Sequence, residues 1–381
     1  MAKKLEQLKV RLRRERDDSY PIVIGSGIFP ALARELKRQP LGSGYAIISD
    51  ATVARLHGPR LLSALRAHKL KARLLTFPAG EKSKNPKVWL ALIGRMLEAG
   101  LGRDAAVIAL GGGVTGDLAG FAAASYLRGV PFIQVPTSLL AMVDASIGGK
   151  VGLDLAQGKN LVGAFWQPKA VYVDLDCLKT LPPLHLQNGL AEVVKSAMIA
   201  DAELYELLDN HTDIVEAPDP RILLQMIKRS LRVKATVVEK DELETLGLRK
   251  ILNYGHTIGH ALEALSNYRL LHGFAIALGM QAAARIAMDM GFLHMGDYDR
   301  QNLLLCTLGF PLQMPARLSA RLKTREGKAQ FFAYLFKDKK VKAGRVEMVL
   351  LRGIGRVKKF EDNWTVPVSA EMIEAGLQQI S

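Results

Sequence analysis

Short apolar segments alternate with longer amphipathic segments through the first half of the chain. Residues 45–49, 105–110 and 132–135 are apolar and bounded by Gly, Pro or Asp, a pattern typical of buried strands. Residues 85–99 and 116–127, which lie between them, have the length and composition of helices. This alternation predicts a parallel, doubly wound α/β sheet.

From about Leu190 onward, strand patterns give way to segments with helical periodicity. The junction lies near Pro182 and Pro183, because two prolines interrupt any continuing element. We therefore predict an α/β plus all-α fold, with a Rossmann-like α/β nucleotide-binding domain over residues 1–183 and a mainly helical domain over residues 184–381. The expected helices of the second domain cover residues 191–208, 221–240, 258–265 and 275–290, and two later apolar runs cover residues 331–336 and 346–351.

Length and cysteine content narrow the class of protein. A chain of 381 residues is long enough for two or three domains with large cores. Its two cysteines, Cys177 and Cys306, cannot build a disulfide framework, which favours a reducing compartment. The N-terminal segment has no apolar core of a signal peptide, and no apolar run reaches the length of a membrane span. We expect a soluble, cytoplasmic protein that has no membrane partner.

The net charge of +15 suggests an anionic partner. Residues 1–16 contribute +5 and residues 317–359 contribute +11, so the remainder of the chain is nearly neutral. Neither segment interleaves its basic residues with stacking aromatic residues, and neither matches a nucleic-acid-binding module. A solvated basic face with some lysines directed at substrate is therefore favoured over nucleic-acid binding.

A glycine-rich turn follows the predicted strand at residues 105–110. Gly111, Gly113 and Gly116 have the Gly-x-Gly-x-x-Gly spacing, and a helix is expected directly afterwards. Backbone N–H groups at such a helix start can bind a diphosphate. The motif lies a hundred residues into the chain rather than after a first strand, so the ordinary Rossmann order is not followed. Nucleotide binding is favoured over a turn without ligand.

Histidines cluster in the helical half. His256 and His260 are four residues apart and would share one face of a helix, while His272 and Glu192 are further candidate ligands. Spacing alone predicts that His256 and His260 form a zinc pair. The alternative is that these histidines cap helices or line a core.

Lysines occur repeatedly beside glycine pairs and amides. Lys150 ends the segment Asp-Ala-Ser-Ile-Gly-Gly-Lys, Lys159 and Asn160 follow, and Lys195 lies one helical turn after Glu192. Glycine allows close approach of the backbone to an anion, so this pattern predicts phosphate or carboxylate contacts.

These motifs together identify a family. The segments GGGVTGDLAGFAAASYLRGVPFIQVPTSLLAMVDASIGGK, GKNLVGAF, DLDCLKTLP, GLAEVVK and LNYGHTIGHALE closely resemble 3-dehydroquinate synthases, which are sugar-phosphate cyclases of the shikimate pathway. The resemblance extends from about residue 50 to residue 355. It implies an enzyme with NAD and a divalent metal, zinc or cobalt, bound between an α/β domain and a helical domain that carries metal and substrate ligands.

The resemblance also implies roles for individual residues. Glu192, His256 and His272 would bind the metal, and His260 would face the substrate phosphate, which replaces the interpretation based on spacing. The implied cofactor-binding residues are Asp50, Glu81, Lys84, Gly112, Gly113, Asp117, Thr137, Ser138, Asp144, Lys159, Thr180 and Leu181. The implied catalytic and substrate-binding residues are Arg128, Asp144, Lys150, Lys159, Asn160, Lys195, Lys234, Glu244, Arg249, Asn253, His260 and a lysine of the KDKK turn, Lys339 or Lys340.

The implied reaction is the conversion of 3-deoxy-D-arabino-heptulosonate 7-phosphate to 3-dehydroquinate and phosphate. Transient oxidation by NAD, phosphate elimination, reduction and an intramolecular aldol closure would occur in turn. Because the substrate carries a phosphate and a carboxylate, a cluster of cationic side chains suits it. Arg128 is expected to reach the site of a neighbouring subunit, which implies a homodimer.

Two departures from the family pattern affect the site. Phe274 stands where the family usually has Glu after His-Gly, and we expect the loss of this carboxylate to remove a hydrogen-bond partner of the metal ligands. The segment DELETLGLR is one residue longer than usual near Leu246, which leaves the assignment of Glu244 open.

Two alternative functions remain. Another sugar-phosphate cyclase would act on a substrate without the carboxylate, although Lys234, Arg249, Asn253 and His260 keep the 3-dehydroquinate synthase pattern. A metal-dependent oxidoreductase resembling glycerol dehydrogenase would share the fold and the glycine-rich turn, but that group lacks the lysines of SIGGK and GKN.

Overall fold

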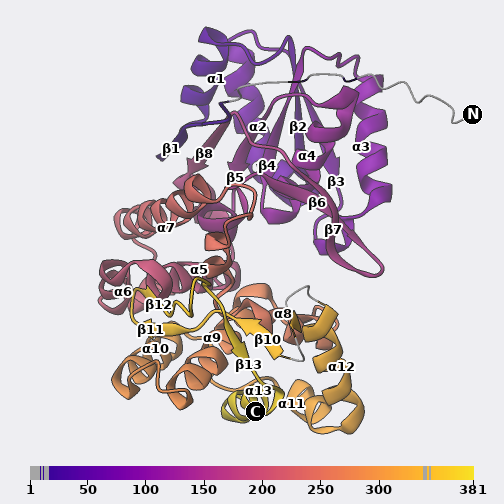
Figure 1. Ribbon diagram of the computed structural model, residues 1–381. Helices are drawn as coiled ribbons and strands as arrows, with labels where there is room; N and C mark the ends of the chain where they lie inside the picture. The colour runs from indigo at the N-terminus through magenta and orange to yellow at the C-terminus, as the bar shows by residue number, and fades with distance from the viewer. Residues whose placement is uncertain (1–8, 10–11, 13–16, 338–340, 343–344) are drawn as a thin grey trace, which may run out of the picture.

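Six parallel strands form the centre of the N-terminal half (Figure 1). The computed structural model describes residue 9, residue 12 and residues 17–337, 341–342 and 345–381. Every residue of the central strand β4 is buried, because helices cover both faces of the sheet. The spatial order of the strands is β1 (Ile22–Gly25), β8 (Ala170–Asp174), β5 (Phe132–Pro136), β4 (Ala105–Gly111), β2 (Gly44–Asp50) and β3 (Ala72–Phe77). The predicted α/β class and the three predicted strands are confirmed.

Two pairs of helices pack on opposite faces of this sheet. Ile47 of β2 lies in one apolar cluster with Leu61 of α2, whereas Ile48 lies in a second cluster with Leu92 of α3. Successive strand residues point to opposite faces, so adjacent isoleucines serve different layers. The helices are α1 (Phe29–Arg38) and α2 (Ala51–Ala67) on the first face, and α3 (Pro86–Glu98) and α4 (Gly113–Ser125) on the second.

A β-hairpin extends from this half and was not predicted from the sequence. Its antiparallel strands are β6 (Lys150–Leu155) and β7 (Gly158–Phe165). Val151 and Leu153 of β6 pack into the cluster that contains α4, while Leu161 of β7 is 58% exposed. The hairpin therefore carries Lys150, Lys159 and Asn160 on one projecting unit.

Helices dominate the C-terminal half, as predicted. Asp201 divides the predicted helix over residues 191–208, because its side chain accepts a hydrogen bond from the backbone N–H of Leu204 and begins a new helix. The helices are α5 (Pro183–Ala200), α6 (Ala202–Asp209), α7 (Pro220–Lys240), α8 (His256–Leu265), α9 (His272–Asp289), α10 (Met295–Thr307), α11 (Ala316–Lys323), α12 (Arg325–Lys337) and α13 (Ala370–Gln379).

Short strands accompany the helices of this mainly helical half. These strands form two small antiparallel sheets in the described part of the last forty residues or so (Figure 1). They are β9 (Val341–Lys342), β10 (Arg345–Met348) and β13 (Val366–Val368) in one sheet, and β11 (Leu351–Gly353) and β12 (Arg356–Val357) in the other. Strands this short leave too few alternating positions for a reliable sequence pattern.

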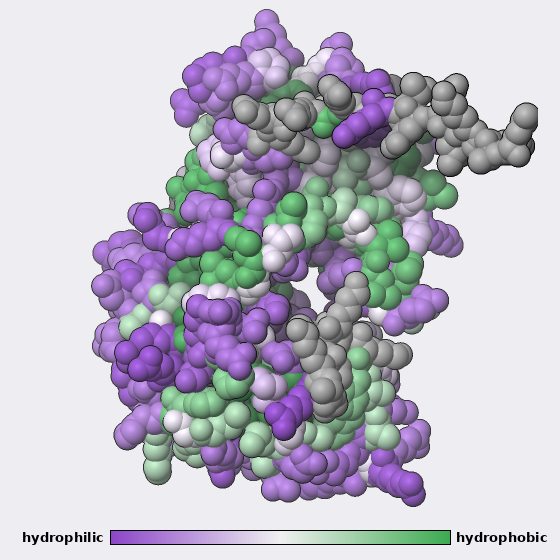
Figure 2. Space-filling model, in the orientation of Figure 1, coloured by the Kyte–Doolittle hydropathy of each residue, from purple (hydrophilic) through white to green (hydrophobic). Residues whose placement is uncertain are grey.

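The two halves share one continuous apolar cluster and leave a hollow between them. Ile108 of the sheet and Val194 of α5 belong to the same cluster. The space-filling view shows the molecule hollowed between the α/β half and the helical half (Figure 2). Among the described residues, no helix combines the length and apolar character needed to cross a membrane.

Candidate active site

The residues expected to hold a dinucleotide lie along one edge of the sheet. Asp50 ends β2, Gly112 and Gly113 follow β4, and Thr137 follows β5. The carboxyl ends of neighbouring parallel strands meet at one edge, where open α/β sheets bind ligands. The other predicted residues at this edge are Glu81 and Lys84 after β3, Ser138 after β5, and Thr180 and Leu181 after β8 and the 3₁₀ segment Leu175–Thr180.

Helix α4 begins without a side-chain cap at this edge. Its N-cap residue is Gly112, whereas Asp50 caps α2 and Asn85 caps α3. A Cβ atom added to Gly112 would lie 3.3 Å from Ser138 Oγ, so a side chain here would crowd the turn in front of the helix. Uncapped N–H groups at the positive end of a helix dipole suit a diphosphate. These residues therefore fit a dinucleotide cofactor.

Lys84 connects three elements beside this turn. Its buried ammonium lies 2.5 Å from Asp117 Oδ2 on α4 and donates to the side-chain oxygen of Asn160 on the hairpin. Burial raises the pKa of Asp117 to about 6, although Lys84 opposes this effect. Asp117 is therefore still mostly ionised at neutral pH and holds the lysine in place.

Lys159 connects the hairpin to the helical half. Its Nζ lies 3.1 Å from Glu81 Oε1 and 3.6 Å from Oε1 of Glu263 on α8. The same ammonium lies 4.6 Å from the ring centroid of Tyr268, within cation–π distance. The lysine thus spans the hollow between the cofactor edge and the helical half.

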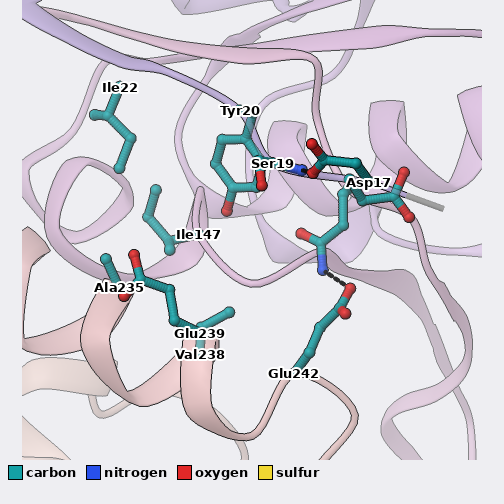
Figure 3. A pocket seen from close by; sticks show the side chains of 11 residues that line it. Asp17, Ser19, Tyr20, Ile22, Ile147, Ala235, Val238, Glu239 and Glu242 are labelled. Atoms are coloured by element: carbon teal, nitrogen blue, oxygen red, sulfur yellow. Dashed lines mark hydrogen bonds between the residues drawn. The ribbon is translucent and has the colours of Figure 1, made fainter. Parts of the chain in front are cut away.

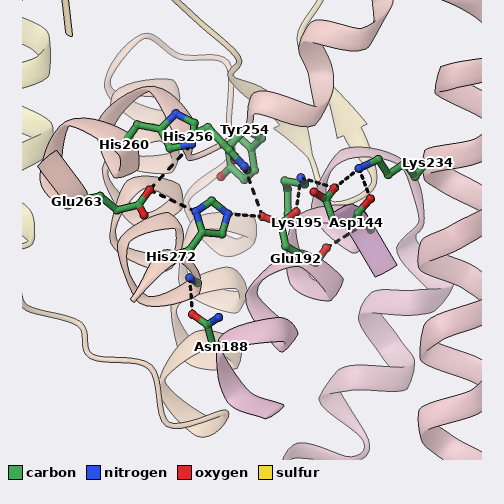
Figure 4. A network of polar contacts seen from close by, with 12 residues as sticks. Asp144, Asn188, Glu192, Lys195, Lys234, Tyr254, His256, His260, Glu263 and His272 are labelled. Carbon is green, nitrogen blue, oxygen red and sulfur yellow. Dashed lines mark hydrogen bonds and ion pairs between the residues drawn. The ribbon is translucent and has the colours of Figure 1, made fainter. Parts of the chain in front are cut away.

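Glu192, His256 and His272 form a group suited to a metal ion (Figure 4). Each offers one ligand atom, and these atoms lie within 4.8 Å of one another. Glu192 Oε1 is 3.4 Å from His256 Nε2 and 3.3 Å from His272 Nε2. A carboxylate and two imidazoles are a donor set that zinc accepts. The three helices α5, α8 and α9 each supply one of these residues.

Electrostatics at this group favour a cation. Burial would raise the pKa of Glu192, but Lys195 and His272 outweigh it and lower the pKa to about 2. Burial would lower the pKa of His272, but Glu192 and Glu263 raise it to about 10. His256, by contrast, has a pKa well below its usual value because burial and neighbouring cations disfavour its charged form. Carboxylates that stabilise a proton at His272 would equally stabilise a divalent cation there.

His260 lies next to this group and on its outer side. Its ring is 5.1 Å from the ring of His256, yet its Nε2 lies 4.0 Å from Glu263 Oε2 rather than beside Glu192. The side chain of His260 is 50% exposed, whereas that of His256 is nearly buried. The two imidazoles share a face of α8, but His256 joins the group with Glu192, whereas His260 belongs to a second group of possible ligands with Glu263 and His272.

Glu263 is the functional candidate that the sequence analysis missed. Oε2 of its buried carboxylate lies 3.2 Å from His272 Nδ1, within hydrogen-bond distance. The other oxygen, Oε1, lies 3.6 Å from Lys159 Nζ. Such a carboxylate fixes which ring nitrogen of a metal-binding histidine is free for the metal. Helical spacing could have found it, because Glu263 follows His256 by seven residues and His260 by three on the same helix.

Although Phe274 removes the carboxylate that the family usually has at this position, the metal group still has a carboxylate beside it. The ring of Phe274 packs 5.4 Å from the ring of Phe310, against the apolar core. Glu263 supplies the carboxylate that contacts His272. The side chain at position 274 therefore serves packing in this chain.

The half-buried Asp144 and two buried lysines form a chain of charges beside the metal group (Figure 4). Lys234 Nζ donates to Asp144 Oδ1 at 2.6 Å, and Lys195 Nζ lies 3.7 Å from the same oxygen while also pairing with Glu192. Asp144 stands in a π-helical turn, Ala141–Ala145, a type of irregularity that often occurs at functional sites. Burial would lower the pKa of Lys195, but Glu192 and Asp144 outweigh it and raise the pKa above its usual value, so the ammonium persists.

Arg249 anchors the wall of the hollow that contains Lys150. The buried guanidinium donates to the carbonyl oxygen of Gly148 at 3.0 Å and lies 3.6 Å from Glu244 Oε1, which also pairs with Lys150 at 2.5 Å. Asn253 ends the neighbouring 3₁₀ segment Leu248–Asn253. Glu244 therefore contacts two predicted substrate-binding cations.

The longer segment around Leu246 is accommodated in an exposed loop. Asp241 accepts backbone N–H donors from Leu246 and Arg249, and Leu246 itself is 74% exposed. The extra residue leaves the backbone anchor of Arg249 intact.

Arg128 lies in a strained turn away from these clusters. Leu127, Arg128 and Gly129 all have positive φ values, of 48°, 71° and 111°. Consecutive left-handed residues without glycine are costly and often mark functional segments. Arg128 is exposed, and no described contact places it in the site of its own chain. Lys339 and Lys340 lie outside the described residues.

A separate pocket lies between the segment around Tyr20 and helix α7 (Figure 3). Its volume is about 390 Å³, and Tyr20, Ile147 and Glu242 help to line it. The Tyr20 hydroxyl accepts from the backbone N–H of Gly148 at 3.2 Å, and the Glu242 carbonyl accepts from Arg249 at 2.6 Å. Two lining residues of the pocket thus contact Gly148 and Arg249, and the lining contains none of the predicted site residues.

Family profiles match most of the chain. The profile of the 3-dehydroquinate synthase N-terminal domain matches residues 74–188, and that of the C-terminal domain matches residues 189–341. The chain is 43% identical to the 3-dehydroquinate synthase of Desulforamulus reducens, covering 90% of this chain and 94% of the relative. It is also 43% identical to the 3-dehydroquinate synthase of Symbiobacterium thermophilum, covering 96% and 98%.

Solved structures of related cyclases have the same fold. The 2-epi-5-epi-valiolone synthase ValA of Streptomyces hygroscopicus, with NAD⁺ and Zn²⁺ bound, superposes with a TM-score of 0.85 at 30% identity over 97% of this chain and 99% of that one. A 2-deoxy-scyllo-inosose synthase complexed with carbaglucose-6-phosphate, NAD⁺ and Co²⁺ gives a TM-score of 0.84 at 29% identity over 94% and 96%. A probable glycerol dehydrogenase of Sinorhizobium meliloti shares the fold at 16% identity.

Proposed function

The chain belongs to the 3-dehydroquinate synthase family, and from this premise we propose that it converts 3-deoxy-D-arabino-heptulosonate 7-phosphate to 3-dehydroquinate and phosphate. This lyase reaction would serve aromatic amino acid biosynthesis through the shikimate pathway. The observation that carries the proposal is the convergence, around one hollow, of a metal-binding group, an uncapped glycine turn and buried cations.

NAD and a divalent metal, zinc or cobalt, are the cofactors of the proposed enzyme. The metal would be held by Glu192, His256 and His272, whose donor types and proximity fit it. The dinucleotide would lie along the sheet edge from Asp50 to Thr180, with its diphosphate at Gly112 and Gly113 and further contacts to Asp144 and Lys159. When bound, NAD⁺ accepts and returns a hydride, and the metal polarises the alcohol oxygen of the substrate.

The cationic side chains would orient the substrate by its two anionic groups. Lys150, Lys234 and Arg249 would supply the positive charge for these groups, and His260 and Asn253 would add hydrogen bonds on the phosphate side. Lys195 would donate to a substrate oxygen while Glu192 and Asp144 hold its ammonium in place. Fixed charges in a site that excludes water position a substrate strongly.

The carboxylates beside the metal group are unsuited to proton abstraction. The pKa of Glu192 is about 2, and the pKa of Asp144 is also lowered, because Lys234 and Lys195 outweigh its burial. Weakly basic carboxylates make poor general bases at neutral pH. We therefore assign the base in the elimination step to the phosphate group of the substrate itself.

A phosphate-release assay tests the proposed function. Purified protein with NAD⁺ and Zn²⁺ or Co²⁺ should release one phosphate for each heptulosonate phosphate consumed, without accumulating NADH, because the cofactor is regenerated in each turnover. A hexose phosphate and glycerol are the matched control substrates. Phosphate release from the hexose phosphate alone would favour another cyclase, and stoichiometric NADH from glycerol would favour the oxidoreductase.

A homodimer is part of the proposal, with Arg128 entering the site of the neighbouring subunit. A Cβ atom at Gly129 would lie 2.5 Å from the ring of Trp166, which follows β7, so the strained turn adjoins this hairpin. Leu161 and Phe165 of β7 are 58% and 44% exposed, which is unusual for large apolar side chains unless a partner covers them. A second copy would cover this face and receive Arg128.

Complementation between subunits would test the role of Arg128. Arg128→Ala and His272→Ala proteins should each be nearly inactive, yet hybrids formed by mixing them should regain activity, because one site then has both native residues. The expected recovery is up to about a quarter of the wild-type activity for random mixing of two subunit types. Hybrids that stay inactive, with mixed dimers verified by two different affinity tags, would show that Arg128 acts within its own subunit.

The boundary between the two domains is also part of this proposal. We place an α/β NAD-binding domain at residues 1–183 and a metal- and substrate-binding domain at residues 184–381. The start of α5 at Pro183 supports this boundary. The proposed biosynthetic role is consistent with a cytoplasmic location.

A further inference from the structure

The three residues of the metal group are buried to different degrees. The side chains of Glu192 and His256 are 1% and 10% exposed, whereas that of His272 is 26% exposed. A divalent cation in water is surrounded by bound water molecules, and losing them all at once on the way into a buried site costs much free energy. A route on which protein ligands replace the water molecules in steps avoids this cost. Such a route needs ligands between the surface and the buried group.

His260 and Glu263 lie where the exposed end of such a route would be (Figure 4). The side chain of His260 is 50% exposed, and its Nε2 lies 4.0 Å from Oε2 of Glu263. The same oxygen lies 3.2 Å from Nδ1 of His272, so the carboxylate lies between the outer histidine and a ligand of the buried group. Ligand atoms of His260, Glu263 and His272 lie within 4.8 Å of one another, so these residues form a second group that can hold a cation.

The two groups share His272 and are close together. The ring of His256 lies 5.1 Å from that of His260 and 5.3 Å from that of His272, and the rings of His260 and His272 are 5.9 Å apart. Glu263 lies 3.2 Å from Nδ1 of the shared ring, and Glu192 lies 3.3 Å from its Nε2. A cation in the outer group therefore needs to pass only one imidazole ring to reach the inner group.

The charges beyond the inner group disfavour entry from that side. Lys195 pairs with the carboxylate of Glu192, and the ammonium of Lys234 lies close by on Asp144 (Figure 4). Both lysines are buried, so water and salt screen their charges poorly. A divalent cation that approached from this side would be repelled by two positive charges, which leaves the side of His260 as the favoured entrance.

One lysine also lies near the outer group, but it leaves one carboxylate oxygen to the histidines. Lys159 Nζ is 3.6 Å from Oε1 of Glu263 and is closer to Glu81, at 3.1 Å. The contacts with His260 and His272 are made by Oε2 instead. The outer group therefore offers an incoming cation a carboxylate oxygen together with two imidazoles, a donor set that zinc accepts.

We propose that His260 and Glu263 form a transient docking site for the divalent metal, from which the cation passes by way of His272 into the group with Glu192 and His256. The inference rests on the metal site of the proposed function and not on the reaction at that site. It gives His260 a role before substrate binds, in addition to its contact with the substrate phosphate.

A docking site has a kinetic signature that distinguishes it from a ligand of the bound metal. It lowers the barrier between free and bound metal without changing the free energy of either end state. Its loss therefore slows uptake and release by the same factor and leaves the dissociation constant unchanged. Loss of a ligand of the bound metal raises the dissociation constant.

The rates of metal uptake and release test this inference. Metal-free protein is mixed with Co²⁺ in a stopped-flow instrument, and the visible absorption of the bound cobalt is followed. Release is measured by adding excess EDTA to the loaded protein, under conditions where the rate does not depend on the EDTA concentration. We expect His260→Ala to slow both rates by about 10-fold, the effect of losing one contact to a charged group, and to keep the dissociation constant within about 3-fold of the wild type.

Two further variants separate docking from a merely structural effect. His260→Asp replaces one metal-binding side chain by another and should restore part of both rates. His185→Ala removes an exposed histidine at the start of α5 and should leave both rates unchanged. Glu263→Gln cannot serve this purpose, because Glu263 also contacts a ligand of the bound metal.

Wild-type rates in the His260→Ala protein overturn the inference alone, and so does an equal slowing in His185→Ala. A change confined to one of the two rates in His260→Ala also overturns it, because the dissociation constant then changes as well. Wild-type protein that takes up no Co²⁺ overturns the metal site of the proposed function and the inference with it. Protein that takes up Co²⁺ with the expected rates but releases no phosphate from the heptulosonate phosphate overturns the proposed reaction and leaves the docking site supported.

Discussion

Replacement of His272 by alanine is expected to abolish metal binding and activity, whereas replacement of His260 by alanine leaves the metal in place. His272 lies between two carboxylates, and its Nε2 is 3.3 Å from Glu192 Oε1 within the metal-binding group. His260 lies outside the group with Glu192 and is half exposed. Loss of one of three protein ligands should weaken metal affinity by at least about 100-fold. Even the loss of a residue that only hydrogen-bonds to a ligand lowers metal affinity by about 10- to 100-fold.

The two variants should differ in what they lose. His260→Ala should keep its metal affinity within about 3-fold of the wild type and should instead raise KM, because a half-exposed imidazole contributes a hydrogen bond to the substrate. Zinc content after dialysis and phosphate release measured in parallel distinguish the two effects. Equal loss of zinc from both variants would restore the interpretation that His256 and His260 are the metal pair.

Replacement of Glu263 by glutamine should weaken metal binding by about 10- to 100-fold without removing any ligand. The carboxylate holds Nδ1 of His272 at 3.2 Å and thereby leaves Nε2 free toward Glu192. Its other oxygen pairs with Lys159 at 3.6 Å, so the charge also positions a cofactor-side lysine. We expect a lower zinc affinity together with a higher dissociation constant for NAD⁺, measured by zinc competition and by calorimetry.

Phe274→Glu is the matched control for this second prediction. The ring of Phe274 packs against Phe310, so a glutamate there cannot replace Glu263. We expect an unchanged zinc affinity and a loss of about 1–3 kcal/mol of stability from the lost packing. A Phe274→Glu protein that binds zinc more tightly, or a Glu263→Gln protein with wild-type affinity, would show that position 274 carries the functional carboxylate.

Much of the fold follows from the local order of apolar residues and glycines along the sequence. The run from Ala105 to Gly111 is apolar at every position, and it becomes a central strand buried on both faces. The glycines that follow it begin α4 without a cap, as their lack of side chains requires. By contrast, the hairpin with Lys150 and Lys159 was missed, because its exposed strand β7 lacks an alternating apolar pattern.

The candidate site was only partly predictable, because helical spacing does not say which way a helix faces. The spacing of His256 and His260 correctly placed both rings on one face of α8, but α5 brings Glu192 beside only one of them. Phe274 looked like a missing carboxylate in the sequence, although α9 turns its ring toward Phe310. Glu263 was visible in the motif HTIGHALE and gained a role only when α9 placed His272 against it.

The sequence by itself determined the alternation of elements, the glycine turn and the family resemblance, because each depends on residues close together in the chain. The tertiary structure alone decided that Glu192 meets His272 eighty residues later and that Lys84 reaches Asn160 on the hairpin. Such contacts depend on how helices pack and rotate against one another. Packing of this kind is set by the whole core, to which all of the segments contribute.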